Sequence, residues 1–264
     1  MEFISANGIS MSVDISGAPN KPAVMFGNSL AADMEMWRAS VSFLESDFTI
    51  LRYDGRGHGA SEATSGDYSL DLLGRDALSI LDALGFGQIH YVGLSLGGMV
   101  GQWLAVNARE RLKSLTLCAT FSQADWGMWD ERVTAVRSSG VAPMLDGTLQ
   151  RWLTASFRQT QLEETDRVRE MILRTSVDGY AGSAAAIRDM EISDYPSRID
   201  LPTLLVAGDQ DPSAPPELMR KMHEQISGSE FSLIEDSAHV FTVEQPEQTA
   251  NIIGRFLRGR EDFQ

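Results

Sequence analysis

The sequence has little cysteine and few basic residues, and each shortage excludes a class of protein. The single cysteine, Cys118, rules out an intrachain disulfide and suits a reducing compartment. The 22 Lys and Arg residues are outnumbered by 37 Asp and Glu residues, which gives a net charge of -15. Because nucleic acids and anionic membranes bind basic faces, we expect neither of them as a partner.

Long apolar runs and metal-binding spacings are also missing. There is no stretch of about 18 apolar residues, and residues 1–8 do not combine a basic start with an apolar run. We therefore expect a cytoplasmic protein. The sequence is also compatible with a homo-oligomer. No H-E-x-x-H or paired-cysteine spacing occurs, so we predict no metal. The glycine-rich residues 55–59 do not fit the dinucleotide fingerprint G-x-G-x-x-G.

What the sequence does contain is the pattern of a globular α/β protein. Hydrophobic residues make up 43% of the 264 residues, enough for one sizeable core. Short apolar runs without polar alternation, typical of parallel strands covered on both faces, alternate with helical patterns. The runs are residues 23–26, 48–51, 89–92, 115–118, 203–206 and 231–234. The alternation predicts a doubly wound sheet, and Asn7-Gly8 predicts a hairpin within residues 1–17.

Residues 122–194 interrupt this alternation. They show helical patterns without a convincing strand, and they contain three of the five tryptophans, Trp126, Trp129 and Trp152. An ordinary pair of crossover helices is the alternative, but about 70 residues is long for one crossover. We interpret the segment as a helical cap over the active site, inserted into a core domain of residues 1–121 and 195–264.

A nucleophile motif follows the third of the apolar runs. Residues 93–97 fit G-x-S-x-G, with a strand pattern before them and a helical stretch, residues 99–106, after them. This context places Ser95 on a sharp strand-to-helix turn, where small neighbours let the strand and helix approach each other. The helix N-terminus directs N–H groups toward the site. We predict that Ser95 is a nucleophile; a solvent-exposed serine in a glycine-rich turn is the alternative.

A serine hydroxyl is a weak nucleophile and needs a base, which in turn needs a carboxylate to orient it. His239 and Asp211 follow the last two apolar runs, at the carboxyl ends of strands, where open α/β sheets place their ligands. His90 is more typical of a strand, His223 of a solvated helix face, and His58 of a turn. Asp209 competes with Asp211, which we prefer because the loop must turn before a side chain reaches His239.

An ester hydrolase also needs two donors for the oxyanion of its intermediate. The backbone N–H of Leu96, directly after the nucleophile, is one candidate. The second is expected from the loop after the first apolar run, and we choose the N–H of Leu30. If the substrate carries a carboxylate, the cap should supply a cation. Arg132 near Trp129 and Arg151 beside Trp152 are the candidates, and Trp129 and Trp152 are predicted to bind substrate with them. Both arginines could instead be solvated on helix faces.

The chain resembles the α/β-hydrolase superfamily and, within it, the 3-oxoadipate enol-lactonases. The resemblance rests on residues 28–30, Trp37, residues 51–61 and residues 93–98, and it extends to residues 101–103, 117–118 and 151–154. It implies a mostly parallel eight-stranded sheet with helices on both faces and a helical cap. It also implies a cofactor-free enzyme that opens a carboxylate-bearing lactone with Ser95, Asp211 and His239.

Three stretches depart from the enol-lactonase pattern, namely residues 194–196, 208–212 and 240–242. Because these stretches lie near the expected pocket, an esterase or lactonase for a more apolar substrate fits equally well. Two further alternatives share the scaffold. One is a haloperoxidase-like or carbon–carbon bond hydrolase that works without a cofactor, and the other is a non-catalytic binding protein.

Overall fold

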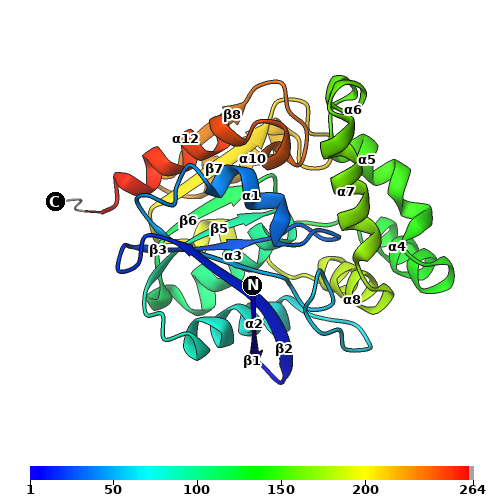
Figure 1. Ribbon diagram of the computed structural model, residues 1–264, viewed down its shortest axis with the longest axis horizontal. Coiled ribbons are helices and arrows are strands. Elements are labelled where there is room, and N and C mark those ends of the chain that lie inside the picture. Colours follow the sequence, from blue (N-terminus) through cyan, green and yellow to red (C-terminus); the bar gives the residue numbers. More distant parts are fainter. Residues whose placement is uncertain (262–264) are drawn as a thin grey trace.

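The computed structural model describes residues 1–261 and shows one eight-stranded sheet (Figure 1). Its spatial order is β1-β2-β4-β3-β5-β6-β7-β8, and all pairings are parallel except those of β2 with β1 and β4. The strands are β1 (Glu2–Ala6), β2 (Ile9–Gly17), β3 (Ala23–Gly27), β4 (Thr49–Tyr53), β5 (Ile89–Leu94), β6 (Leu112–Cys118), β7 (Thr203–Gly208) and β8 (Glu230–Ile234). The predicted mostly parallel sheet is confirmed.

The burial of the strands explains their sequences. Every residue of β3, β4, β5 and β7 is buried, as their uninterrupted apolar runs predict for strands covered on both faces. The predicted N-terminal hairpin is also present: β1 and β2 pair around Asn7 and Gly8, whose φ angles are 46° and 81°. A tight two-residue hairpin turn requires these positive φ angles, which Asn and Gly adopt most readily.

Helices cover both faces of the sheet, with α2 and α3 on one side and α1 and α12 on the other (Figure 1). The apolar residues Leu73, Ala77, Ile80 and Leu81 of α2 are buried, and Ser69 caps its N-terminus by accepting from Leu72 N–H at 3.1 Å. The core helices are α1 (Arg38–Val41), α2 (Leu70–Ala83), α3 (Leu96–Asn107), α9 (Tyr195–Arg198), α10 (Pro216–Gln225), α11 (Phe241–Glu244) and α12 (Pro246–Arg258), with short 3-10 turns at Met34–Trp37 and Arg109–Arg111.

Between β6 and α9 the chain forms helices without a strand, and these helices lie together at one end of the sheet (Figure 1). They are α4 (Trp126–Ser139), α5 (Leu145–Trp152), α6 (Ala155–Thr160), α7 (Leu162–Arg174) and α8 (Val177–Arg188), with a 3-10 turn at Ala142–Met144. We call α4 to α8 the cap helices. The division into core and cap domains stays a prediction, and residues 262–264 of the predicted core lie outside the described residues.

The cap helices are attached to the core by a backbone contact and by ion pairs. Ser176 donates from both N–H and Oγ to the carbonyl of Gly57, at 3.2 and 2.9 Å. A side chain on Gly57 or Gly179 would collide with the other glycine, so the two backbones touch directly. Asp67 of the core pairs with Arg188 of α8 at 2.9 Å, and also with Arg137 of α4. These contacts hold the cap helices against one end of the sheet.

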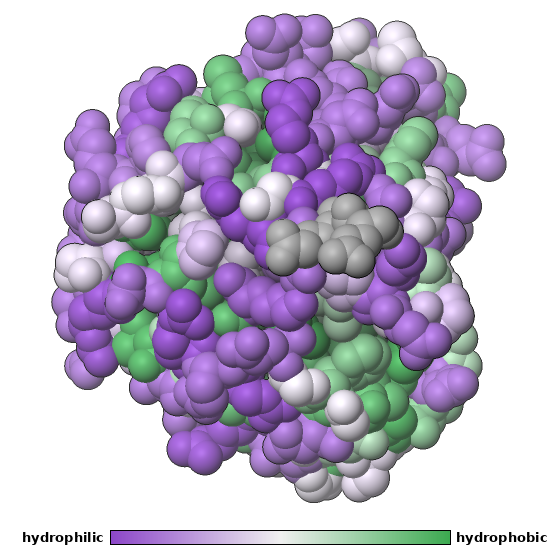
Figure 2. Space-filling model, turned by 90° about the vertical axis from the view of Figure 1, so that its left-hand side faces the viewer, coloured by the Kyte–Doolittle hydropathy of each residue, from purple (hydrophilic) through white to green (hydrophobic). Residues whose placement is uncertain are grey.

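In the part of the chain that the structure describes, the opposite end of the sheet carries no comparable layer of helices (Figure 1). Figure 2 shows this face, on which hydrophilic residues predominate and separate several hydrophobic areas. Within residues 1–261, none of the helices combines the length and the apolar character needed to cross a membrane.

Candidate active site

Ser95 lies at the turn between β5 and α3, with φ 55° and ψ -113°. A non-glycine residue rarely adopts this backbone conformation, and it persists because the surroundings hold it in place. The N–H of Ser95 donates to Cys118 O at 2.9 Å, and the hydroxyl of Thr120 donates to Ser95 O at 2.7 Å. The turn therefore holds Ser95 in place at the N-terminus of α3.

The two glycines of the motif are required by close packing. A Cβ atom at Gly93 would collide with the carbonyl of Gly97, and a Cβ atom at Gly97 would collide with the carbonyl of Gly27 in β3. Strand β5, helix α3 and the loop after β3 thus approach each other at the turn, as the sequence predicts. Cys118, at the end of β6, is fully buried, and burial raises the pKa of its thiol, so it behaves as a hydrophobic side chain.

His239 and Asp211 meet in the structure. Nδ1 of His239 lies 2.8 Å from Oδ2 of Asp211, and both residues are buried. The other oxygen of Asp211 accepts from the N–H groups of Ser213 and Ala214 at 2.7 and 3.2 Å. These donors fix the carboxylate, which in turn holds the imidazole with Nδ1 protonated and Nε2 available as an acceptor.

Asp209, the competing carboxylate, has a different position. It is exposed, and its Oδ1 accepts from the N–H of Ser237 at 3.0 Å. Asp209 thereby holds the loop that precedes His239 but does not bind its ring. The geometry favours Asp211 as the orienting acid, because only Asp211 contacts the imidazole.

One cavity is lined by most of the predicted residues, although Asp211 and Leu96 are not among them. Ser95 and His239 line it, and so do all four residues predicted from the cap. Tyr180 of α8 and Thr148 of α5 were missed by the sequence analysis, because nothing in these helical sequences marks those two residues as facing the cavity. The lining residues are Ser29, Leu30, Ala31, Ser95, Trp129, Arg132, Thr148, Arg151, Trp152, Tyr180, Ser213 and His239.

The two arginines in this cavity lack carboxylate partners. Within residues 1–261, neither Arg132 nor Arg151 forms an ion pair. The Arg132 guanidinium lies 4.5 Å from the centre of the Trp129 ring, and Arg151 donates to Thr148 Oγ1 at 3.3 Å. Burial, together with the charge of Arg132, lowers the pKa of Arg151. The cavity therefore carries uncompensated positive charge in a chain that is strongly acidic as a whole.

The predicted oxyanion donors come from two elements: Leu96 directly follows Ser95, and Leu30 lies in the loop after β3 and lines the cavity with Ser95. Leu96 is the first residue of α3, and the first N–H groups of a helix have no partner within that helix. The N–H of Leu30 meets no acceptor among the described residues. Its loop is anchored by Asn28, whose Nδ2 donates to Tyr53 O at 2.7 Å and whose Oδ1 accepts from Trp37 at 3.1 Å. The arrangement leaves two backbone donors free for a ligand.

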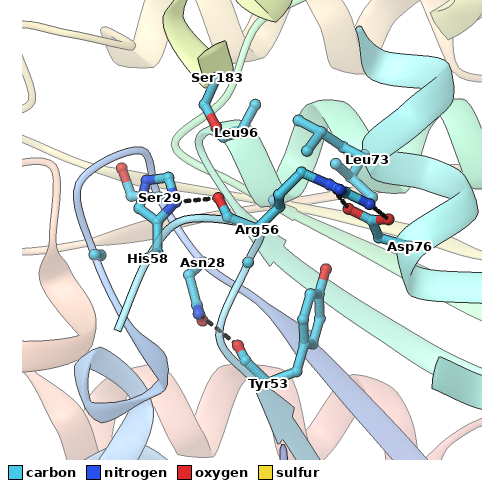
Figure 3. Close-up of a pocket in the computed structure, with 13 residues that line it drawn as sticks. Asn28, Ser29, Tyr53, Arg56, His58, Leu73, Asp76, Leu96 and Ser183 are labelled. Carbon is cyan, nitrogen blue, oxygen red and sulfur yellow. Dashed lines mark hydrogen bonds and ion pairs between the residues drawn. The ribbon is translucent and has the colours of Figure 1, made fainter. Parts of the chain in front are cut away.

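The tract of residues 54–59 lies on the far side of these loops, around a second cavity (Figure 3). Ser29 and Leu96 border it, and Figure 3 shows His58 turned to the Arg56 carbonyl, 3.0 Å from its Nδ1. The Arg56 guanidinium makes a bidentate pair with Asp76 at 2.9 and 2.6 Å. His58 is therefore part of a turn behind the site, and it does not line the cavity that contains Ser95.

Titratable side chains do not gather elsewhere in a way that would hold a metal ion. Within residues 1–261, no group of three or more His, Cys, Asp or Glu side chains has a suitable arrangement.

Comparisons with known proteins agree with this fold. A family model described as alpha/beta hydrolase fold matches residues 22–246. The chain is 32% identical to "3-oxoadipate enol-lactonase 1" of Acinetobacter baylyi over 253 residues, covering 95% of this chain and 94% of the relative. It also superposes on the enol-lactonase of Burkholderia xenovorans with a TM-score of 0.95 and 30% identity, covering 97% of this chain and 100% of that one. A hydrolase from Pseudomonas aeruginosa has a TM-score of 0.93 and 35% identity, with 97% of each chain covered. The chain belongs to the family with the alpha/beta hydrolase fold.

Proposed function

We propose that the protein is a serine hydrolase that opens a small lactone bearing a carboxylate, of the 3-oxoadipate enol-lactone type. The observation that carries this proposal is the pair of arginines without carboxylate partners in the cavity that Ser95 and His239 also line. The names of the relatives, enol-lactonases with 30–32% identity, support the same substrate class. A serine, a histidine held by a buried carboxylate and two free N–H donors suit acyl transfer.

In the proposed reaction, Ser95 Oγ attacks the lactone carbonyl while Nε2 of His239 takes its proton. The N–H groups of Leu30 and Leu96 stabilise the oxyanion, a contribution of about 3 kcal/mol for each donor. The ring C–O bond then breaks, and His239 returns the proton to the departing oxygen. His239 next takes a proton from water, whose oxygen attacks the acyl carbon. The bond between that carbon and Ser95 Oγ then breaks, and His239 gives the proton to Oγ, which restores the serine. Both steps need only groups of this chain and one water molecule.

The substrate carboxylate is proposed to bind between Arg132 and Arg151. A guanidinium suits a carboxylate because it donates two parallel hydrogen bonds. An anion at this position would also relieve the repulsion that lowers the pKa of Arg151. The indole N–H of Trp129 is buried and has no acceptor among the described residues, so it offers a further donor next to Arg132.

The arginine assignment predicts selective losses. We expect Arg132→Gln and Arg151→Gln each to lower kcat/KM for a carboxylate-bearing γ-lactone by roughly 10- to 100-fold, because each removes a charge-assisted contact. The same variants should change kcat/KM for a neutral γ-lactone of equal size less than about threefold. Steady-state kinetics on the two lactones measures the difference.

A matched control is Arg169→Gln, which removes a charge from α7 where Arg169 pairs weakly with Asp146 and Asp166 at 3.9 and 3.5 Å. This variant should leave both lactones unaffected. Equal losses on the anionic and the neutral lactone in the Arg132 and Arg151 variants would contradict carboxylate binding by these side chains.

The reaction class is tested with a panel of γ-lactones, short acyl esters, β-diketones and a halogenation assay. We expect turnover of lactones and esters, with the carboxylate-bearing lactone giving the highest kcat/KM. Turnover confined to β-diketones or to halogenation would replace the proposal with one of the other reactions on this scaffold. No turnover and no reaction with a fluorophosphonate would indicate a binding protein.

A further inference from the structure

A buried carboxylate outside the proposed catalytic set lies between the cap and the loop of His239. Glu244 ends α11 and is 8% exposed. Its Oε2 accepts from the N–H of Ala238 at 2.6 Å, directly before His239 in the chain. Its Oε1 accepts from both N–H and Oγ of Thr154, each at 2.8 Å. One side chain therefore bonds to the segment carrying the proposed base and to a segment of the cap.

Glu244 is bonded to a cap segment that lies next to residues lining the cavity. Thr154 follows Trp152 and Arg151, both of which line the cavity with His239. A second bond joins the same two segments, because the N–H of Val240 donates to Trp152 O at 3.0 Å. The rings of Trp152 and His239 lie 6.3 Å apart. Hydrogen bonds therefore join residues 152–154 to residues 238–240 both directly before and directly after His239 in the chain.

The bonding pattern identifies Glu244 as an ionised acceptor. Burial raises the pKa of Glu244, while the donors Ala238 and Thr154 oppose this effect. All three neighbouring groups donate to its oxygens, and a protonated carboxyl would place a donor opposite another donor. A buried anion that is held only by such donors is costly to maintain, so its geometric role has to outweigh its desolvation.

We propose that Glu244 is a positioning residue that couples the cap segment carrying Arg151 and Trp152 to the loop of His239. Glu244 does not touch the reacting atoms. It fixes the position of the imidazole relative to the part of the cap that binds substrate. The imidazole therefore lies at the correct distance from the carbonyl that reacts. The inference rests on the proposed roles of Ser95 and His239. It adds a connection between binding and proton transfer that neither role contains.

The test compares Glu244→Gln with Glu247→Gln, an exposed glutamate three residues further along that loses the same charge. In Glu244→Gln one end of the side chain becomes an NH2 group, which cannot accept from the Ala238 or Thr154 N–H that it faces. We expect the second-order rate of fluorophosphonate labelling at Ser95 to fall by roughly 10- to 100-fold, the size of effect expected when a reacting group is displaced by about 1 Å. Glu247→Gln should label at the wild-type rate.

A spectroscopic readout separates positioning from general loss of structure. The proton shared by His239 and Asp211 should give a low-field proton resonance in the wild-type protein, measured by NMR. We expect it to shift or broaden in Glu244→Gln while circular dichroism stays unchanged. If Glu244→Gln does not fold, Thr154→Val keeps Glu244 and removes one of its three donors, and it should show a smaller change in the same direction.

The outcomes distinguish the two layers of the argument. The positioning role alone is overturned if folded Glu244→Gln is labelled at Ser95 at the wild-type rate and keeps the wild-type resonance. If Glu244→Gln does not fold, the same result in Thr154→Val overturns it. No labelling of the wild-type protein, or labelling that persists in Ser95→Ala, overturns the proposed serine mechanism on which that role rests. An equal loss in Glu247→Gln would assign the effect to net charge and reject the coupling.

Discussion

Replacing Ser95 with alanine is expected to lower kcat for the preferred lactone by at least about 1,000-fold, since the nucleophile of a triad contributes that much or more. Alanine removes only the Oγ atom and can occupy the same backbone turn. The hydrogen bonds of the Ser95 N–H and carbonyl, to Cys118 and from Thr120, remain. Folding should therefore be preserved, and KM should change far less than kcat. Steady-state kinetics and thermal unfolding of the purified variant provide both measurements.

Covalent labelling gives an independent measure of the same prediction. A fluorophosphonate should modify the wild-type protein once per chain, and mass spectrometry should place the adduct on Ser95. The Ser95→Ala variant should remain unlabelled at the same reagent concentration. An adduct on another serine, or full activity in the variant, would refute the proposed nucleophile.

The second large effect is expected from the acid. Asp211→Asn should lower kcat by roughly 1,000- to 10,000-fold, as in other triads where the amide reverses the hydrogen bond to the imidazole. An asparagine NH2 facing Nδ1 of His239 would favour the tautomer with the proton on Nε2, which then cannot accept from Ser95. The measurement is kcat at the pH of maximal wild-type activity, together with the low-field proton resonance of the His239–Asp211 pair.

Asp209→Asn is the matched control, since it makes the same chemical change two residues away. Asp209 accepts from the N–H of Ser237 and does not contact the imidazole. We expect kcat to fall less than about tenfold, because an asparagine oxygen can still accept that bond. If the two variants exchanged their effects, Asp209 would be the orienting acid and the preference for Asp211 would be wrong.

The positions of the core elements could be predicted because their signals are local. The apolar runs mark the strands, and the G-x-S-x-G spacing with its strand and helix specifies the turn at Ser95. The order of strands also brings the loops of Asp211 and His239 to one edge of the sheet, so their meeting follows from topology. The sequence favours Asp211 over Asp209 but does not decide between them, because the path of the loop between β7 and α10 determines which carboxylate turns inward.

The cap was less predictable, for a different physical reason. Arg132 and Arg151 lie on α4 and α5, and only the packing of these helices brings both side chains into one cavity. Helical periodicity gives the face on which a residue lies but not the neighbour that the face meets. Tyr180 illustrates this limit, since α8 is rich in small residues and nothing in its sequence marks one aromatic ring as lining the site. Glu244 escaped notice because two of its three donors are backbone N–H groups and the third, the hydroxyl of Thr154, is distant in the sequence.

The contact between Gly57 and Gly179 has a consequence for how such enzymes can be diversified. Each glycine excludes a side chain on the other, so the distance between the loop of Gly57 and helix α8 can hardly change. A lid taken from a relative would seat on this scaffold only if it brought a glycine to the matching place, with a hydroxyl three residues earlier to replace Ser176. Recombination that exchanges substrate specificity is therefore restricted to related proteins that have the same close contact between two glycines, whatever their binding residues.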